Sequence, residues 1–315
     1  MAEKMYILLA MADAEEYRKD LQLKFPGLTI HAVTAEEEIK HHVGRVEILI
    51  TIYRVADDLL KQAANLKWIQ VITSGVNYLL SRPSLREDII ITSGRGIHGP
   101  QVSEMAILLM LALNRNFPEN VRNQDRRAWI RWKSKLLYHK KVGIFGIGFI
   151  GEELARKCKA FGMTVYGIDI VKRDLECVDL FHAPEDLPRV AEEVDYLVLV
   201  APSTPETEKI VGKHLLAHMK PTAFLLNLAR GELVDEAALT EALEAGQIAG
   251  AALDALSVEP LPPEHPLWAT KNLIITPHVA GESDIYRQQV VPIIEENLRR
   301  FLNGERRNLI NFVER

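Results

Sequence analysis

Three polar residues that could bind an anion and move a proton each follow a predicted strand in the second half of the chain. They are Arg230, Glu259 and His278. Because ligands of open α/β sheets bind at the carboxyl ends of the strands, we expect the three side chains at one edge of a sheet. Taken singly, each also has a plain structural explanation: an exposed guanidinium, a loop carboxylate and a capping histidine. Together they indicate a candidate active site.

A glycine-rich turn of the form GxGxxG, Gly146-Ile-Gly148-Phe-Ile-Gly151, lies between a predicted strand and residues with helical spacing. Gly146 permits the tight turn, Gly148 lets the backbone approach a pyrophosphate, and Gly151 allows helix and strand to pack closely. The N–H groups and dipole of the helix N-terminus favour phosphates. The next predicted strand ends in Asp169, roughly 18 residues after Gly151, near the spacing of an acid that binds ribose hydroxyls. The pattern predicts a dinucleotide site; the alternative is a glycine-rich turn beside a surface aspartate.

The same acid bears on which dinucleotide binds. A carboxylate at Asp169 would repel the 2′-phosphate of NADP, so the sequence favours NAD. Lys172 and Arg173 follow within four residues and could reach such a phosphate, although basic residues after a strand more often form a solvated face. We therefore predict NAD as the cofactor.

The elements that must position these residues alternate between strands and helices. Apolar runs predict strands at Met5–Ala10, Leu28–Val33, Val46–Ile50, Trp68–Ile72 and Ile89–Thr92, and then at Lys141–Phe145, Thr164–Ile168, Tyr196–Val200, Ala223–Leu228, Ala249–Leu253 and Leu273–Thr276. Helical spacing marks Ala14–Leu23, Ala35–His42 and Val55–Asn65. This alternation predicts an α/β fold of two doubly wound parallel sheets, and six strands in the second series match a full dinucleotide-binding fold.

Four further segments carry expectations of their own. Val102–Asn114 is apolar on nearly every side, so we expect a buried helix between two domains. Asn116–Lys141 is polar and basic without a strong period and is interpreted as a linker or arm. A helix is expected between Asp235 as N-cap and Gly246 past its end. Ile285–Leu302 follows the last strand and could pack back on the first domain.

Composition excludes several classes of protein. With 315 residues the chain is long enough for about two domains. Its 38 basic and 43 acidic residues give a net charge of −5, so we expect no nucleic-acid partner. The longest apolar stretch, Met105–Leu113, is too short to cross a bilayer. The two cysteines, Cys158 and Cys177, form no metal-ligand cluster, and residues 1–10 lack a secretory pattern, so we expect a cytoplasmic protein without a metal.

Beyond these local signals, nearly the whole chain resembles the D-isomer-specific 2-hydroxyacid dehydrogenase family. The matching segments are Ser74-Gly-Val-Asn, Gly146 to Gly151, Ala201-Pro-Ser-Thr-Pro-Glu-Thr207, Asn227-Leu-Ala-Arg-Gly-Glu-Leu-Val-Asp235, Asp254 to Pro260 and Thr276-Pro-His-Val-Ala-Gly281. The resemblance implies a Rossmann NAD-binding domain, residues 101–283, inserted in a flavodoxin-like substrate domain, residues 1–100 plus 284–315. It also implies a homodimer built on the NAD-binding domain. The implied activity is NAD(H)-dependent reduction of small 2-oxo acids, of glyoxylate or hydroxypyruvate type, to D-2-hydroxy acids.

The resemblance assigns a role to each candidate residue. Arg230 would bind the substrate carboxylate and carbonyl, His278 would donate the proton, and Glu259 would support the histidine. These types suit the tasks, because histidine transfers protons near neutral pH, a nearby carboxylate favours imidazolium, and a guanidinium forms a planar fork. The residues implied to contact NAD are Ser74, Gly146, Gly148, Phe149, Ile150, Gly151, Asp169, Ala201, Pro202, Leu228, Ala229, Arg230, Asp254, His278 and Gly281.

The substrate is expected to meet a turn of the first domain. Ser74, Gly75 and Val76 follow its fourth strand, and the N–H groups of Gly75 and Val76 could cradle a carboxylate; alternatively, the turn only ends the strand. Arg54 is a weaker candidate, for a second anionic group on the substrate. His98 could help to close the cleft, although a structural turn histidine is the commoner explanation.

Other functions on the same fold stay open. Formate dehydrogenase is disfavoured, because its relatives carry glutamine where this chain has Glu259. A phosphoglycerate dehydrogenase without a regulatory domain is one alternative, and an NAD-sensing corepressor or scaffold is another. Trp129 and Trp132 could enter a partner subunit's pocket or pack at a dimer interface.

Overall fold

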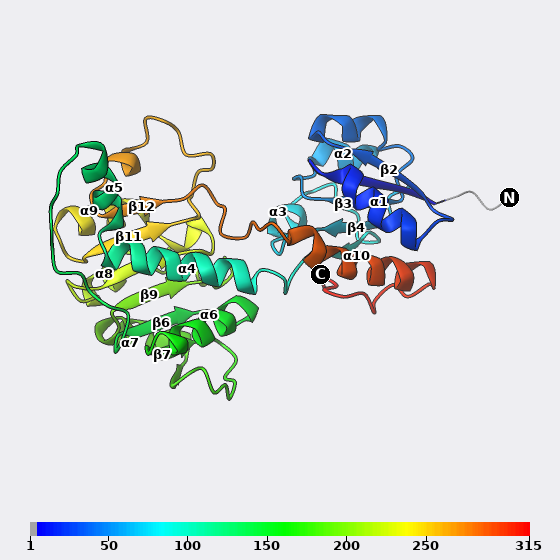
Figure 1. Cartoon of the computed structure of the whole chain (residues 1–315). Helices are drawn as coiled ribbons and strands as arrows, with labels where there is room; N and C mark the ends of the chain where they lie inside the picture. The colour runs from blue at the N-terminus through cyan, green and yellow to red at the C-terminus, as the bar shows by residue number, and fades with distance from the viewer. Residues whose placement is uncertain (1–4) are drawn as a thin grey trace. The chain divides into compact units, whose positions relative to one another are not determined.

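The chain folds into two parallel β-sheets flanked by helices, and the computed structural model describes residues 5–315 (Figure 1). Contacts divide the chain into two units. The first unit comprises the described residues up to Ile97 together with Ser283–Arg315, and the second unit comprises His98–Glu282. The divisions expected from the sequence lie within a few residues of these. The predicted fold class, two doubly wound parallel sheets, is confirmed.

The first unit holds a five-stranded parallel sheet of order β2-β1-β3-β4-β5, which is the flavodoxin-like order. Its elements are β1 (Tyr6–Ala10), α1 (Ala14–Lys24), β2 (Thr29–Val33), the 3-10 helix η1 (Glu36–His41), β3 (Ile48–Thr51), α2 (Asp57–Gln62), β4 (Trp68–Val71), α3 (Asn77–Leu80), β5 (Ile90–Thr92) and α10 (Tyr286–Leu302). The carboxyl ends of β3 and β4 therefore carry the loops that contain Arg54 and Ser74.

The second unit holds a seven-stranded parallel sheet of order β12-β11-β10-β9-β6-β7-β8. Its elements are α4 (Gly99–Asn114), α5 (Phe117–Asp125), β6 (Lys141–Phe145), α6 (Phe149–Ala160), β7 (Thr164–Ile168), β8 (Leu180–His182), η2 (Pro184–Asp186), α7 (Leu187–Glu193), β9 (Tyr196–Leu199), α8 (Lys213–His218), β10 (Phe224–Asn227), η3 (Gly231–Leu233), α9 (Glu236–Glu244), β11 (Gly250–Leu253), η4 (Pro266–Ala269) and β12 (Leu273–Ile275). The chain reverses its direction of winding between β6 and β9, which is where Rossmann folds bind dinucleotides.

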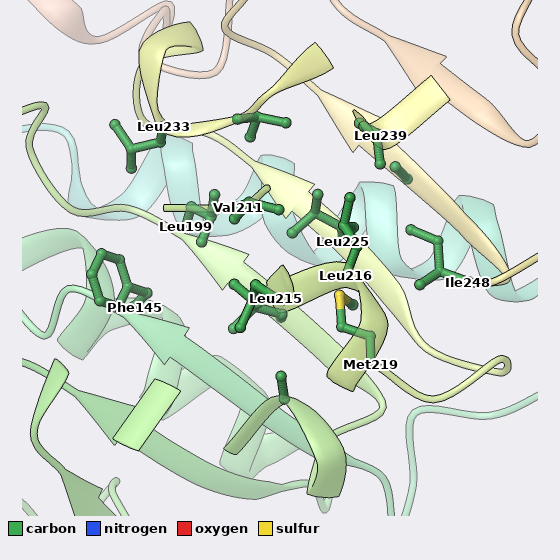
Figure 2. Packing of buried hydrophobic residues seen from close by; sticks show 14 of the residues in the cluster. Phe145, Leu199, Val211, Leu215, Leu216, Met219, Leu225, Leu233, Leu239 and Ile248 are labelled. Atoms are coloured by element: carbon green, nitrogen blue, oxygen red, sulfur yellow. The ribbon is translucent and has the colours of Figure 1, made fainter. Parts of the chain in front are cut away.

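Buried side chains cover both faces of each sheet, because successive residues of a strand point to opposite sides. In β1, Ile7 and Leu9 pack in one apolar cluster, while Leu8 and Ala10 pack in another. In the second unit, Leu199 of β9 and Leu225 of β10 lie among side chains of α8 and α9, as Figure 2 shows. Residues buried on both faces produce the continuous apolar runs from which the strands were predicted.

Helix α10 belongs to the first unit, because a buried polar group joins it to the sheet. The Asn297 amide donates to Gln70 Oε1 of β4 at 3.0 Å and to the Ile310 carbonyl at 3.0 Å. Asn297 Oδ1 accepts from the Ile310 N–H at 2.6 Å. Asn297 and Gln70 are fully buried, so these bonds satisfy groups that water cannot reach.

Three expectations about elements were wrong. The second sheet has a seventh strand, β8, which was missed because its three residues pair only with β7 at an edge and are partly exposed. The segment Asn116–Lys141, interpreted as a linker or arm, begins with helix α5. The stretch Ala35–His42 forms a 3-10 helix, in which Glu38 accepts from the N–H groups that precede it. No helix among residues 5–315 is long and apolar enough to span a membrane.

Candidate functional site

The glycine turn between β6 and α6 is closed by two backbone contacts that exclude a side chain. Gly146 has φ of +101°, and a Cβ there would lie 2.7 Å from the Ala201 nitrogen. A Cβ at Gly151 would lie 2.0 Å from the Gly146 carbonyl oxygen. The first glycine therefore brings the turn against the end of β9, and the last lets α6 begin directly over the turn.

Gly148 is different, because nothing in the protein requires a glycine there. Its φ of −85° suits any residue, and a Cβ would meet no protein atom within 4 Å. Gly148 is exposed at the N-cap of the twelve-residue helix α6, and no side chain caps that end. An open, side-chain-free space before a helix N-terminus fits a pyrophosphate, whose charge the helix dipole favours. The turn is thus suited to a dinucleotide.

Asp169 lies beside this turn at the end of β7. One carboxylate oxygen accepts from the Ile147 N–H at 2.7 Å, and the other accepts from the Val171 N–H at 3.1 Å. These bonds hold a half-buried negative charge beside the glycine turn, where an acid could accept hydrogen bonds from the ribose hydroxyls of a dinucleotide. Phe149 is exposed and Ile150 is half-buried in the first turn of α6.

Arg230 is positioned by a buried residue that sequence reasoning did not select. Asn227, at the end of β10, accepts from the Ala229 N–H at 3.1 Å and donates to the Arg230 carbonyl at 2.8 Å. Arg230 itself donates from Nη1 to the Ala229 carbonyl at 2.6 Å. Asn227 is fully buried, so the loop has one arrangement of backbone bonds. The sequence signal that could have identified Asn227 is a polar residue at the end of an otherwise apolar strand.

The loop after β10 packs against the loop after β11 through another glycine. A Cβ at Gly231 would lie 2.0 Å from the Leu256 carbonyl carbon, so only glycine allows this approach. Leu228, Ala229 and Ala201, expected near the cofactor, are buried, whereas Pro202 is exposed.

Asp254 organises the loop that carries the histidine. It is 2% exposed, and its Oδ1 accepts from Thr276 Oγ1 at 2.6 Å and from the Val279 N–H at 3.1 Å. Its Oδ2 accepts from the Ala280 N–H at 3.0 Å. A buried carboxylate is tolerated when it is fully hydrogen-bonded, and these three donors provide that compensation. The resemblance implied that Asp254 lies at the nicotinamide. In the structure its carboxylate accepts hydrogen bonds from one hydroxyl and two backbone N–H groups, and so holds the 276–280 loop.

Glu259 and His278 form the pair that the sequence predicted. His278 Nδ1 lies 2.9 and 2.8 Å from the two Glu259 carboxylate oxygens. The Leu256 N–H donates to Glu259 Oε1 at 2.9 Å, which fixes the carboxylate. The imidazole is 42% exposed, and within residues 5–315 its Nε2 has no hydrogen-bond partner. Nδ1 is therefore held by the carboxylate while Nε2 is open to a ligand.

His98 lies at the N-cap of α4 in the same unit. A Cβ at Gly281 would lie 3.2 Å from the His98 ring, so the ring packs against the end of the loop that carries His278. Burial, together with the charge of Arg230, lowers the pKa of His98 from 6.5 to about 4. His98 is therefore neutral at pH 7, and the positive charge at this place belongs to Arg230.

The first unit carries the remaining candidates at the ends of its own strands. Ser74, Gly75 and Val76 follow β4, and the Thr73 carbonyl accepts from the Gly94 N–H at 2.8 Å, which ties this turn to β5. Arg54 is exposed, and its guanidinium carbon lies 5.8 Å from the centre of the Tyr78 ring. That these residues meet the substrate stays a prediction. No metal-binding cluster occurs within residues 5–315.

Comparison with known proteins identifies relatives of this chain. A family model described as "D-isomer specific 2-hydroxyacid dehydrogenase, NAD binding domain" matches residues 107–280. A glyoxylate reductase of Korarchaeum cryptofilum is 32% identical over 261 residues, 81% of this chain and 79% of that protein. A D-3-phosphoglycerate dehydrogenase of Methanocaldococcus jannaschii is 32% identical over 283 residues, 88% of this chain and 54% of that protein, so this chain spans about half of that relative.

Solved structures agree with this relationship. A D-isomer specific 2-hydroxyacid dehydrogenase family protein from Aeromonas salmonicida has a TM-score of 0.92 and 32% identity, with 99% of each chain covered. A D-isomer specific 2-hydroxyacid dehydrogenase from Xanthobacter autotrophicus Py2, in complex with NADPH and MES, has a TM-score of 0.85 and 30% identity, with 99% of this chain and 98% of that chain covered.

Proposed function

Because the chain belongs to the D-isomer-specific 2-hydroxyacid dehydrogenase family, we propose that it reduces small 2-oxo acids, such as glyoxylate or hydroxypyruvate, to 2-hydroxy acids, with the D configuration wherever the product is chiral. It is an oxidoreductase with a nicotinamide cofactor. The observation that carries the proposal is the pairing of His278 Nδ1 with both oxygens of Glu259, at 2.9 and 2.8 Å.

His278 serves as the proton donor. When bound, the reduced nicotinamide supplies a hydride to the carbonyl carbon. The carbonyl oxygen becomes negative, and the open Nε2 of His278 gives it a proton. Glu259 holds the ring in one orientation through Nδ1, which leaves Nε2 facing the substrate in this proposal. In the oxidative direction the neutral Nε2 accepts the hydroxyl proton.

Arg230 serves as the substrate anchor. A guanidinium offers two parallel N–H groups to a carboxylate and polarises the adjacent carbonyl. Asn227 fixes the backbone on both sides of Ala229, so the arginine enters the site from a defined position. Because His98 is neutral at pH 7, it adds no second positive charge beside Arg230. Ser74, Gly75 and Val76 complete the site in this proposal.

The test is a panel of 2-oxo acids with NADH, followed by absorbance and by chiral analysis of the product. The D-isomer is expected wherever the product is chiral, as glycerate from hydroxypyruvate is and glycolate from glyoxylate is not. His278→Ala should lower kcat by about 10²- to 10⁴-fold while NADH still binds. Binding of NADH without turnover of any 2-oxo acid would instead favour the NAD-sensing corepressor or scaffold.

NAD is proposed as the preferred cofactor because Asp169 is fixed beside the turn by two backbone N–H groups. We expect NADH to exceed NADPH in kcat/KM by at least about tenfold, since the carboxylate repels a 2′-phosphate. The Xanthobacter relative was solved in complex with NADPH, so NADPH is the comparison that tests this proposal. Equal use of both cofactors would contradict the assignment.

A second candidate substrate follows from Arg54. Its guanidinium has no acidic partner within residues 5–315, and it lies in the loop after β3. It could bind a phosphate on the substrate, as would suit phosphoglycerate dehydrogenase activity. Including 3-phosphohydroxypyruvate in the panel tests this: a higher kcat/KM than for hydroxypyruvate, reduced in Arg54→Ala, would favour that substrate.

A homodimer through the second unit is also proposed. Helices α4 and α5 and the segment after them expose large apolar side chains, among them Leu108, Phe117, Val121, Trp129 and Ile130. Trp129 is 94% exposed, and large apolar side chains exposed in such number over one stretch of chain favour association with a second copy. Sedimentation of the wild type as a dimer, and of Val121→Glu as a monomer, is the expected result.

A further inference from the structure

The loop that follows Asp169 contains a guanidinium that could bind a 2′-phosphate, but another residue holds it. Arg173 Nη1 lies 3.2 Å from Glu152 Oε2, at the start of α6. Arg173 does not pair with Asp169 within residues 5–315. The Cys177 thiol lies 3.8 Å from the Glu152 carbonyl, so the loop itself packs on α6 at this point.

Glu152 bridges two guanidiniums. Its Oε1 pairs with Arg156 one turn along α6, and its Oε2 pairs with Arg173. The Glu152 side chain is 20% exposed and that of Arg173 is 38% exposed, so this ion pair is less screened by water than one on an open surface. A 2′-phosphate can therefore bind Arg173 only if the ion pair between Arg173 and Glu152 is broken.

We infer that Glu152 sets the preference between NAD and NADP by holding Arg173 in an ion pair. Asp169 disfavours the 2′-phosphate by repulsion, and Glu152 removes the arginine that could compensate. A guanidinium matches a phosphate through two N–H groups, whereas the exposed Lys172 offers only a flexible point charge. Glu152 is therefore a specificity-determining residue one position after the glycine motif. The inference rests on the cofactor position proposed above.

Glu153 provides a matched control. It is the next residue on α6, and it pairs with Lys157 at 3.0 Å and Arg156 at 3.3 Å but not with Arg173. Glu152→Gln and Glu153→Gln change the net charge equally. They differ in whether Arg173 is released.

The experiment measures binding of adenosine 2′,5′-bisphosphate and of 5′-AMP by calorimetry at low salt, without any 2-oxo acid. Glu152→Gln should raise affinity for the bisphosphate about three- to fivefold, the scale of a partly exposed ion pair, with 5′-AMP unchanged. Glu153→Gln should change neither affinity. Adding Arg173→Ala to Glu152→Gln should remove the gain, which shows that the effect acts through the arginine.

Four results would overturn the inference. An equal gain in Glu153→Gln would assign the effect to net charge, and a gain that persists without Arg173 would assign it to direct repulsion by Glu152. No gain in Glu152→Gln, with 5′-AMP binding intact, would remove the role of the pair. Failure of 5′-AMP to bind the wild type would instead refute the cofactor position itself, and the inference with it.

Discussion

Protonation of His98 should account for part of the protein's loss of stability in acid. Burial is the main cause that lowers its pKa from 6.5 to about 4, and the charge of Arg230 adds to it. The folded-state pKa is below the unfolded-state value, so between these pH values the unfolded chain binds a proton that the folded chain excludes. The contribution to stability is complete above pH 6.5 and is lost as the pH falls toward 4.

The magnitude follows from the width of that window. At about pH 5 the solution is roughly 1.5 pH units below the unfolded-state pKa. Protonation of the unfolded chain over that interval lowers the free energy of unfolding by about 2 kcal/mol relative to neutral pH. His98 is 9% exposed, so solvent does little to reduce this effect. The variant His98→Gln keeps a polar side chain and cannot titrate. It should therefore lose about 2 kcal/mol less than the wild type over the same interval.

Urea unfolding followed by tryptophan fluorescence, at neutral pH and near pH 5, measures this difference. His214→Gln is the control, because His214 is exposed in the same unit and its removal should leave the wild-type dependence. A lowered stability of His98→Gln at both pH values would report lost packing and does not affect the comparison. The same pH dependence in His98→Gln and wild type would refute the reasoning, since it would mean that the folded protein accepts the charged ring.

Three further predictions concern the site. Asp254→Asn should lower the free energy of unfolding by about 2–4 kcal/mol, because the new amide group places a donor against the Ala280 N–H, which then has no acceptor. Urea unfolding measures this change, and a loss near zero would contradict the role. Glu259→Gln should lower kcat for 2-oxo acid reduction with NADH binding intact, because Nδ1 of His278 loses the charged partner that holds the ring; steady-state kinetics measures this, and an unchanged kcat would refute the role of the pair. Arg230→Lys should raise KM for the oxo acid and lower kcat with NADH affinity intact, as steady-state kinetics and NADH titration would show; impaired NADH binding alone would make Arg230 a cofactor residue.

The fold was predictable because its strands are buried on both faces. Alternate residues of β1 enter two different apolar clusters, which makes the whole strand an apolar run. The same argument fails for β8, whose Leu180 is exposed at the edge of the sheet. It fails also for α5, which begins at Phe117–Pro118 and whose buried residue, Asn123, is polar. Neither element contains a buried apolar side chain, although α5 exposes Phe117 and Val121, and such elements leave a weak apolar pattern in a sequence.

The candidate site was predictable in its residue types and in the loops that carry them, but not in its supports. Glu259 and His278 follow β11 and β12, so their meeting follows from strand order. The carboxylate of Asp254 bonds to backbone N–H groups 25 and 26 residues further on, and Gly231 meets the backbone at Leu256. Such contacts depend on the path of two loops in space, which spacing alone does not specify.

The backbone of His278 adopts a left-handed conformation that Asp254 stabilises. Its φ is +54°, a left-handed conformation that glycine adopts freely and that costs other residues about 1–2 kcal/mol. The three hydrogen bonds that Asp254 accepts from the surrounding loop over-determine this conformation and offset its cost. The cost is thus offset within the loop, and the ring that the loop carries has Nδ1 held by Glu259 and Nε2 open, which is the geometry that the proposed proton donor requires.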